Sequence, residues 1–173
     1  EKIVRAAILN SGGANACTGP QGFADTHRTA EHVGEVLGIS SGEVVVCSTG
    51  LIGELLPMEK IISGVDQISK VLSTDSLQDV ATAIMTTDSV AKIATYKSAN
   101  FEVSGVAKGA GMLAPALATM LSVIMTDAVL PENAQEVFKR VCDRTYNRID
   151  SDGCTSTNDT VLLMGSGASG YEP

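Results

Sequence analysis

A chain of 173 residues has the length of one ordinary domain, and a hydrophobic content of 44% is enough to form a core without disulfides or metals. The formal net charge of −8 argues against a nucleic-acid partner, because no basic stripe is present to bind phosphates. No apolar run is long enough to span a membrane, and the start at Glu1-Lys2 is unlike a signal peptide. We therefore expect a cytoplasmic protein with no membrane partner.

The first elements in chain order are two short strands with a helix between them. Residues 3–9 and 44–47 are apolar or β-branched runs that stop at residues rich in Gly and Ser. The helix between them has an apolar face and is followed by Gly38 as a cap. A second amphipathic helix starts at Pro57, and its apolar stripe contains Met58, Ile61, Ile62, Val65, Ile68 and Leu72.

The second half of the chain contains more strands than helices. A short helix is predicted over 76–85, a hairpin over 92–97 and 101–107, and a strand over 120–125. A long helix over 131–148 and a strand over 160–164 follow. This order favours an α/β fold, a layered sandwich of sheets covered by helices. We expect residues 1–173 to be a single domain, and both termini read as cut from a longer protein.

The cysteines and histidines do not form the patterns of a metal site. The four cysteines lie too far apart in sequence for a zinc knuckle or a thioredoxin-like motif, so we expect reduced, buried thiols at Cys17, Cys47, Cys142 and Cys154. His27 and His32 are five positions apart, which is wrong for the helical i, i+4 pair that binds zinc. The sequence predicts two surface histidines and no bound metal.

A glycine-rich segment after a predicted strand offers a phosphate-binding alternative. Residues 108–114 read KGAGMLA, which matches the outline of a dinucleotide-binding fingerprint. Pro115 would interrupt the helix that this motif requires, and no acidic residue follows at the expected distance. Gly109 and Gly111 in a tight turn explain the segment equally well.

The sequence contains no serine triad, so we consider a nucleophile that needs no histidine as its base. Neither histidine has a suitable partner and no Gly-x-Ser-x-Gly elbow is present. A threonine at a newly formed N-terminus can use its own α-amine, with a pKa of about 7.7–8.0, as the general base. Residue spacing alone does not select one threonine.

Several ordered blocks of sequence select one family. They are NSGGANACTG at 10–19, CSTGLIG at 47–53, MTTD at 85–88, KGAGMLAPALATML at 108–121, MTDA at 125–128 and TSTNDTVLL at 155–163. The chain resembles the ornithine acetyltransferases of arginine biosynthesis, the ArgJ family, in all these blocks and in their order. The resemblance implies an ornithine acetyltransferase/DmpA-like fold.

The resemblance also implies a reaction and the residues that carry it. The precursor would cleave itself between Ala118 and Thr119, and Thr119 would then transfer acetyl from N-acetylornithine to glutamate as a covalent ester. Thr49 and Gly50 match the oxyanion hole, and Thr86 and Lys108 match substrate-contacting positions together with Thr119. No cofactor is implied, and acetyl-CoA enters as a substrate of bifunctional members.

The family also implies an assembly that this chain does not complete. Family members are more than twice as long and function as hetero-oligomers of processed α and β chains. The missing C-terminal half would supply further substrate contacts, so we expect little or no turnover from this chain alone.

Each of these residues also has a structural interpretation. Thr49-Gly50 fits a strand-to-loop corner, Thr86 and Thr87 before Asp88 a helix cap or helix end, Lys108 a solvated lysine, and Thr119 a buried strand threonine. The acidic block from Asp150 to Asp159 fails as a calcium loop because its twelfth position is Val161, and Asn158 and Asp159 read as polar scaffolding.

Two functional alternatives to an acetyltransferase remain from the sequence. One is a self-processing amidohydrolase or aminopeptidase of related fold, which would pass the acyl group to water. The other is an inert domain, or a phosphate-binding module that uses Gly109 and Gly111.

Overall fold

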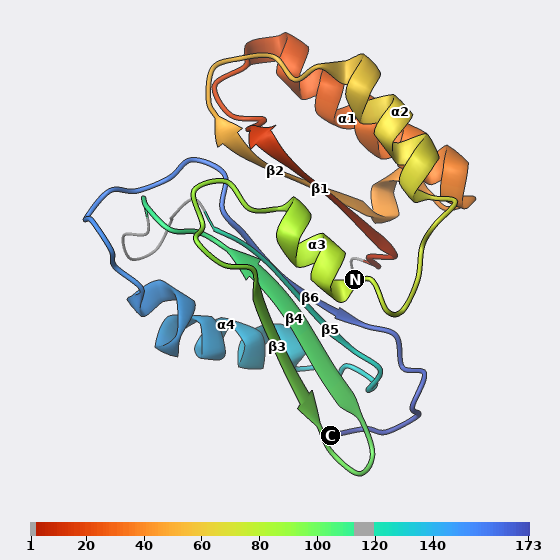
Figure 1. Ribbon diagram of the computed structural model, residues 1–173. Helices are drawn as coiled ribbons and strands as arrows, with labels where there is room; N and C mark the ends of the chain where they lie inside the picture. The colour runs from red at the N-terminus through yellow and green to blue at the C-terminus, as the bar shows by residue number, and fades with distance from the viewer. Residues whose placement is uncertain (1–2, 113–119) are drawn as a thin grey trace. The chain divides into compact units, whose positions relative to one another are not determined.

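The computed structural model describes residues 3–112 and 120–173 of the chain, which form two compact units (Figure 1). The first unit comprises Glu1–Asp79 and the second Val80–Pro173. Helix α3 (Leu77–Ala83) crosses the boundary between them. Each unit combines a sheet with helices, so the predicted α/β class is confirmed.

The first unit is built around two parallel strands. β1 (Ala6–Gly13) pairs with β2 (Val44–Leu51), and α1 (Gly19–Leu37) with the short 3-10 helix Ser41–Glu43 makes the crossover that parallel strands require. α2 (Met58–Ile68) follows β2 and contacts α1. Both long helices cover the same face of the strand pair (Figure 1).

Both strands of this unit extend further than their apolar runs. β1 begins at Ala6 and continues to Gly13, and β2 continues past residue 47 to Leu51. The predicted corner at Thr49-Gly50 is therefore wrong. The strands remain paired because Gly50 faces Gly12 and has no side chain, which allows the Gly12 backbone to approach it closely.

The helix ends follow local turn chemistry more than the apolar stripe. α1 ends at Leu37, with Gly38 in the left-handed conformation at φ 66°, as predicted. α2 ends at Ile68, before Leu72, which is 68% exposed. The sequence Ser-Thr-Asp-Ser that follows Leu72 favours turns, and this explains the early end.

The second unit contains a four-stranded mixed sheet. β3 (Lys92–Lys97) and β4 (Glu102–Lys108) form the predicted hairpin, and β5 (Leu121–Thr126) pairs antiparallel with β4. β6 (Thr160–Gly165) lies parallel to β5 at the other edge. Val106 of β4 and Leu121 and Val123 of β5 are buried on the two central strands of this sheet.

Helix α4 makes the crossover between the parallel strands β5 and β6. It spans Ala134–Arg144 on one face of the sheet, and a 3-10 turn, Tyr146–Arg148, follows it (Figure 1). The predicted helix over 131–148 is thus too long at both ends. Thr145 breaks it, because its φ of −125° and ψ of −88° are not helical.

The environments of the cysteines and histidines differ from expectation in part. All four cysteines are free thiols, but only Cys47 is buried. Cys142 is half-buried and Cys17 and Cys154 are exposed, so the prediction of four buried thiols is wrong for these three. His27 is on the surface as predicted. The side chain of His32 is only 22% exposed, and its Nε2 lies 2.7 Å from an Asp66 carboxylate oxygen, which links α1 to α2.

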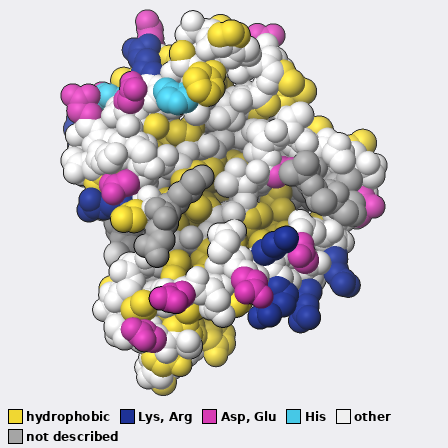
Figure 2. Space-filling model, turned by 180° about the vertical axis from the view of Figure 1, so that it is seen from behind, with side chains coloured by type: hydrophobic (Ala, Val, Ile, Leu, Met, Phe, Trp, Pro, Cys, Tyr) yellow, Lys and Arg dark blue, Asp and Glu magenta, His cyan; other side chains and the backbone are white. Residues whose placement is uncertain are grey.

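Large apolar side chains remain at the surface of both units. Leu51 and Leu55 in the first unit and Val90 and Tyr96 in the second are each more than half exposed. Figure 2 shows such hydrophobic side chains on the face turned away from the viewer in Figure 1. No helix within 3–112 or 120–173 has the length and apolar character needed to cross a membrane.

Candidate active site

A polar cluster around the buried side chains of Asp88 and Lys108 lies in the second unit, where strands β3 and β4 meet the loop after α3. It contains Thr86, Asp88, Lys92, Lys108 and the backbone of Gly109, and we call it the Asp88 cluster. Lys108 is the last residue of β4, and Lys92 is the first residue of β3. The Lys108 Nζ donates a hydrogen bond of 2.8 Å to Thr86 Oγ1. The two residues that resemble substrate contacts are therefore in direct contact.

Asp88 connects the separate segments of this cluster. Its Oδ1 accepts hydrogen bonds from the Gly109 N–H at 2.7 Å and from the Lys92 Nζ at 2.5 Å. Its Oδ2 accepts the Thr86 N–H at 3.3 Å and lies 3.9 Å from the Lys108 Nζ. The Asp88 side chain has no exposed surface. One carboxylate thus holds the loop, the end of β4 and the start of β3 together.

Burial and ion pairing act in opposite directions on the pKa of Lys108 and on that of Asp88. Burial lowers the pKa of Lys108, whose side chain is only 1% exposed, while the Asp88 and Asp159 carboxylates oppose that shift. Burial raises the pKa of Asp88, but hydrogen bonds from Lys92, Gly109 and Thr86 outweigh it and hold the pKa below its usual value. Asp88 is therefore a carboxylate at neutral pH.

A second buried carboxyl group lies at the backbone that follows the predicted nucleophile. Asp159 Oδ1 accepts the Met120 N–H at 2.6 Å, and the Met120 nitrogen is covalently bonded to the carbonyl carbon of Thr119. Among described residues, its buried Oδ2 has no hydrogen-bond donor. Burial raises the pKa of Asp159 to about 6. A carboxyl group with a pKa of about 6 thus contacts the residue that follows the predicted nucleophile.

The first unit holds the residues that resemble the oxyanion hole. Thr49 lies near the end of β2 and is 1% exposed, and Gly50 follows it with φ at 131°. A Cβ at Gly50 would lie 2.4 Å from the Gly12 carbonyl carbon. Only glycine fits this approach of two strands, and glycine also leaves the backbone open to a ligand.

The predicted site residues thus fall into three groups. Thr86 and Lys108 come together in the second unit, and Thr49 and Gly50 are neighbours in the first. Ala118 and Thr119 lie outside the described residues, so their roles stay predictions. Lys108 is not the solvated lysine that its sequence context alone would suggest.

Sequence reasoning missed the importance of Asp88 and Asp159. In the sequence, Thr86 and Thr87 before Asp88 fit a helix cap or helix end, and Asp159 fits scaffolding. In the structure both aspartates accept backbone N–H groups near predicted site residues, and each has a buried carboxylate oxygen. The spacing from Asp88 to Lys92, at the start of a predicted strand, was an available signal for the ion pair. No local pattern indicates the contact from Asp159 to Met120, because the two lie far apart in sequence.

The structure also bears on the phosphate-binding alternative. Gly109 has a φ of 147°, which favours glycine, and its N–H is already bonded to Asp88. The Met112 N–H is similarly bonded to Asp152 Oδ2 at 2.8 Å. A phosphate would need to bind these two N–H groups, but both already donate to carboxylates. The negative charge of the carboxylates would repel a phosphate.

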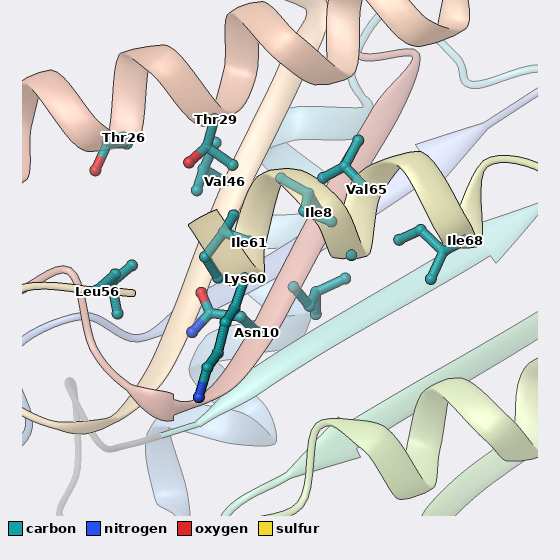
Figure 3. Close-up of a pocket in the computed structure, with 12 residues that line it drawn as sticks. Ile8, Asn10, Thr26, Thr29, Val46, Leu56, Lys60, Ile61, Val65 and Ile68 are labelled. Carbon is teal, nitrogen blue, oxygen red and sulfur yellow. The ribbon is translucent and has the colours of Figure 1, made fainter. Parts of the chain in front are cut away.

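A cavity of about 200 Å³ lies apart from these residues, within the first unit. Figure 3 shows Ile8 and Val46 of the strands and Ile61 and Val65 of α2 around it, with the Lys60 ammonium group directed away from this apolar lining. None of the predicted site residues lines it. Its lining is mostly apolar, with Asn10, Thr26, Thr29 and Lys60 as the polar residues.

Comparison with known proteins gives the same family along the whole chain. A model of the ArgJ family matches residues 1–173. The arginine biosynthesis bifunctional proteins ArgJ of Thermobifida fusca and Streptomyces coelicolor are 56% and 57% identical to the chain over 171 residues. Each match covers 98% of this chain and 45% of the relative, so the chain spans less than half the length of these relatives.

Solved structures agree with this assignment. A crystal structure of ornithine acetyltransferase from Mycobacterium tuberculosis, complexed with ornithine, is 44% identical with a TM-score of 0.54, and the match covers 64% of this chain and 61% of that one. A bifunctional ArgJ protein from Bacillus halodurans is 34% identical with a TM-score of 0.51, covering 63% and 59%. With a family model matched from its first residue to its last and relatives more than half identical, this chain belongs to the ArgJ family.

Proposed function

We propose that this chain carries part of the catalytic centre of an acetyltransferase in arginine biosynthesis. The reaction transfers acetyl from N2-acetyl-L-ornithine to L-glutamate, with acetyl-CoA as a further donor in a bifunctional enzyme. The observation that carries the proposal is the hydrogen bond from the buried Lys108 ammonium group to the Thr86 hydroxyl, because the resemblance gives both residues as substrate contacts. The reaction takes place in the cytoplasm and needs no metal or prosthetic group.

The proposed chemistry begins with cleavage of the Ala118–Thr119 peptide bond. The released α-amine of Thr119 accepts the proton of its own hydroxyl group, and Oγ attacks the acetyl carbonyl carbon of acetylornithine. The amide C–N bond breaks, ornithine leaves with the proton on its amine, and acetyl remains as an ester on Thr119. The α-amine of glutamate then attacks the ester, which restores the Thr119 hydroxyl and yields N-acetylglutamate.

The other residues have defined roles in this proposal. Thr49 and Gly50 donate hydrogen bonds to the developing oxyanion, and loss of one such donor costs about 10²–10³ in rate. The Lys108 ammonium group binds a substrate carboxylate, and its burial strengthens that interaction because little water competes. Thr86 orients that ammonium group through its hydroxyl.

The proposed enzyme is larger than this chain. The relatives are more than twice as long, and the remaining length would supply further substrate contacts and join the processed chains in a hetero-oligomer. We expect the 173-residue chain alone to have little or no turnover.

The first test is the intact mass of the purified chain under denaturing conditions, beside a Thr119→Ala variant. Two masses that correspond to residues 1–118 and 119–173, and one mass in the variant, would support the proposed nucleophile. A cut at another bond, or a cut that persists in the variant, would contradict it.

The second test separates transfer from hydrolysis in the full-length enzyme. Acetylornithine is supplied with and without glutamate, and ornithine release is followed alongside N-acetylglutamate formation. Ornithine release that depends on glutamate supports the transferase. Equal release without glutamate would instead identify the self-processing amidohydrolase.

A further inference from the structure

Asp88 lies at the centre of the cluster yet corresponds to none of the residues to which the resemblance gives a role. It contacts two segments that each contribute a proposed substrate-binding residue, through the Thr86 N–H and the Gly109 N–H. It is also the carboxylate nearest to Lys108, at 3.9 Å. Its position therefore affects both the geometry and the charge of the proposed binding site.

The geometry of these contacts leaves Asp88 few alternatives. Its two oxygens accept three hydrogen bonds, from two backbone N–H groups and the Lys92 ammonium group. The side chain is wholly buried, so water cannot replace a lost partner without a change in packing. An amide in its place would present an NH₂ group to at least one of these donors.

The charges around Lys108 come from three other titratable groups. Asp88 and Asp159 are acidic and favour the ammonium form, whereas Lys92 is basic and disfavours it. Lys92 shares Asp88 with Lys108, but its side chain is 42% exposed, whereas Lys108 is almost fully buried. Without Asp88, two lysines would face each other with only Asp159 to offset them.

We propose that Asp88 is a positioning residue that holds Lys108 against Thr86 and keeps the Lys108 side chain as a cation for a substrate carboxylate. The role in substrate binding rests on the proposed function, whereas the effect on Lys108 does not. Lys92 tunes the site in the opposite direction, because it competes for Asp88 and repels the second ammonium group.

The test is the titration of Lys108 followed by NMR of its side-chain ε-carbon in the labelled 173-residue chain. Asp88→Asn is expected to lower the pKa of Lys108 by about one pH unit or more, as loss of an adjacent opposite charge does. Lys92→Gln is expected to raise it. Asp127→Asn is the matched control, because Asp127 also accepts a backbone N–H, from Glu102 at 2.8 Å, but is not one of the charged groups that act on Lys108.

The inference is supported if the pKa of Lys108 falls in Asp88→Asn, rises in Lys92→Gln and does not change in Asp127→Asn. A purely structural role would not move the pKa in opposite directions in the first two variants. An unchanged Lys108 pKa in a folded Asp88→Asn variant would overturn it. If circular dichroism shows that Asp88→Asn is unfolded, Lys92→Gln decides alone: a raised pKa supports the inference and an unchanged one overturns it.

A second readout uses the full-length enzyme. The KM for acetylornithine should rise at high pH, as Lys108 loses its proton, and this rise should begin at lower pH in Asp88→Asn. If the wild-type enzyme transfers no acetyl group, the proposed function fails, but the Lys108 titration still tests the role of Asp88. If transfer occurs and the Lys108 titration does not move, only the role of Asp88 fails.

Discussion

At the residue scale, Gly50 shows how one position can determine whether two strands approach each other. Its φ of 131° strains any other residue, and an added Cβ would lie 2.4 Å from the Gly12 carbon and 2.6 Å from its oxygen. These are backbone atoms, which cannot rotate away. The close approach of β1 and β2 therefore requires glycine at position 50, whereas a Cβ at Gly12 would meet no atom within 4 Å.

We predict that Gly50→Ala destabilises the chain by about 2 kcal/mol or more, from backbone strain plus the clash. Gly53→Ala is the control: Gly53 also has a positive φ, of 80°, but a Cβ there would meet no atom within 4 Å. Urea unfolding followed by circular dichroism measures both. Equal losses in the two variants would show that the contact with Gly12 does not matter.

Asp159 predicts a pH dependence of stability. Its pKa is about 6 in the folded chain, above the ordinary value of 3.8, so the folded state binds this proton more tightly than the unfolded state. Proton binding by Asp159 therefore adds to the free energy of unfolding. This contribution is complete below pH 3.8 and is lost as the pH rises through about 6. An uncharged side chain at this position removes this loss.

The expected result is that the unfolding free energy of Asp159→Asn, relative to wild type, increases between about pH 4 and pH 6 and then levels off. Urea unfolding at a series of pH values measures this difference. A difference that stays constant over this range would mean that the Asp159 carboxyl group is not perturbed by folding.

At the element scale, two helical glycines look alike in sequence but differ in surroundings. Gly34 lies in α1, where a Cβ would come within 2.9 Å of the Ile39 carbonyl oxygen at the turn into the 3-10 helix. Gly64 lies in α2, where a Cβ would meet nothing within 4 Å. Helix propensity favours alanine equally at both positions.

We therefore predict that Gly64→Ala stabilises the chain by up to about 1 kcal/mol, whereas Gly34→Ala destabilises it, because the contact outweighs propensity. Thermal unfolding of the two variants beside wild type measures the signs. Stabilisation by both changes would show that the turn after α1 can move away from the added methyl group without loss of stability.

The elements also show how far sequence periodicity reaches. The hairpin of β3 and β4 and the end of α1 at Gly38 are predicted because their signals are local. The extent of β1 and β2 depends on pairing between strands far apart in sequence, which no local pattern contains. The site divides similarly: family motifs identify Thr86 and Lys108, but their direct contact and their shared neighbour Asp88 depend on the fold.

At the scale of the whole molecule, the predicted cleavage lies between two paired strands. β4 ends at Lys108 and β5 begins at Leu121, and these two residues are partners in the antiparallel ladder. A cut at Ala118–Thr119 would leave β4 and β5 on different chains. The ladder from Val103 paired with Thr126 to Lys108 paired with Leu121 would remain.

We predict that the cleaved pieces stay associated, because the strand pairs and the buried side chains around them are unaffected by the cut. Native mass spectrometry should give one species at the mass of the whole chain plus one water, where denaturing conditions give two. Separate pieces under native conditions would mean that the β4–β5 pairing needs the covalent link.

The mixed sheet of the second unit also bears on the order of folding and the predicted cleavage. If the chain is cut at Ala118–Thr119, a sheet that contains strands from both sides of the cut would form within one molecule only before the cut. Once cut, the same sheet must form by the encounter of two molecules. The mature protein would then recover from denaturation at a rate that depends on its concentration, whereas the uncut precursor would recover at a rate that does not.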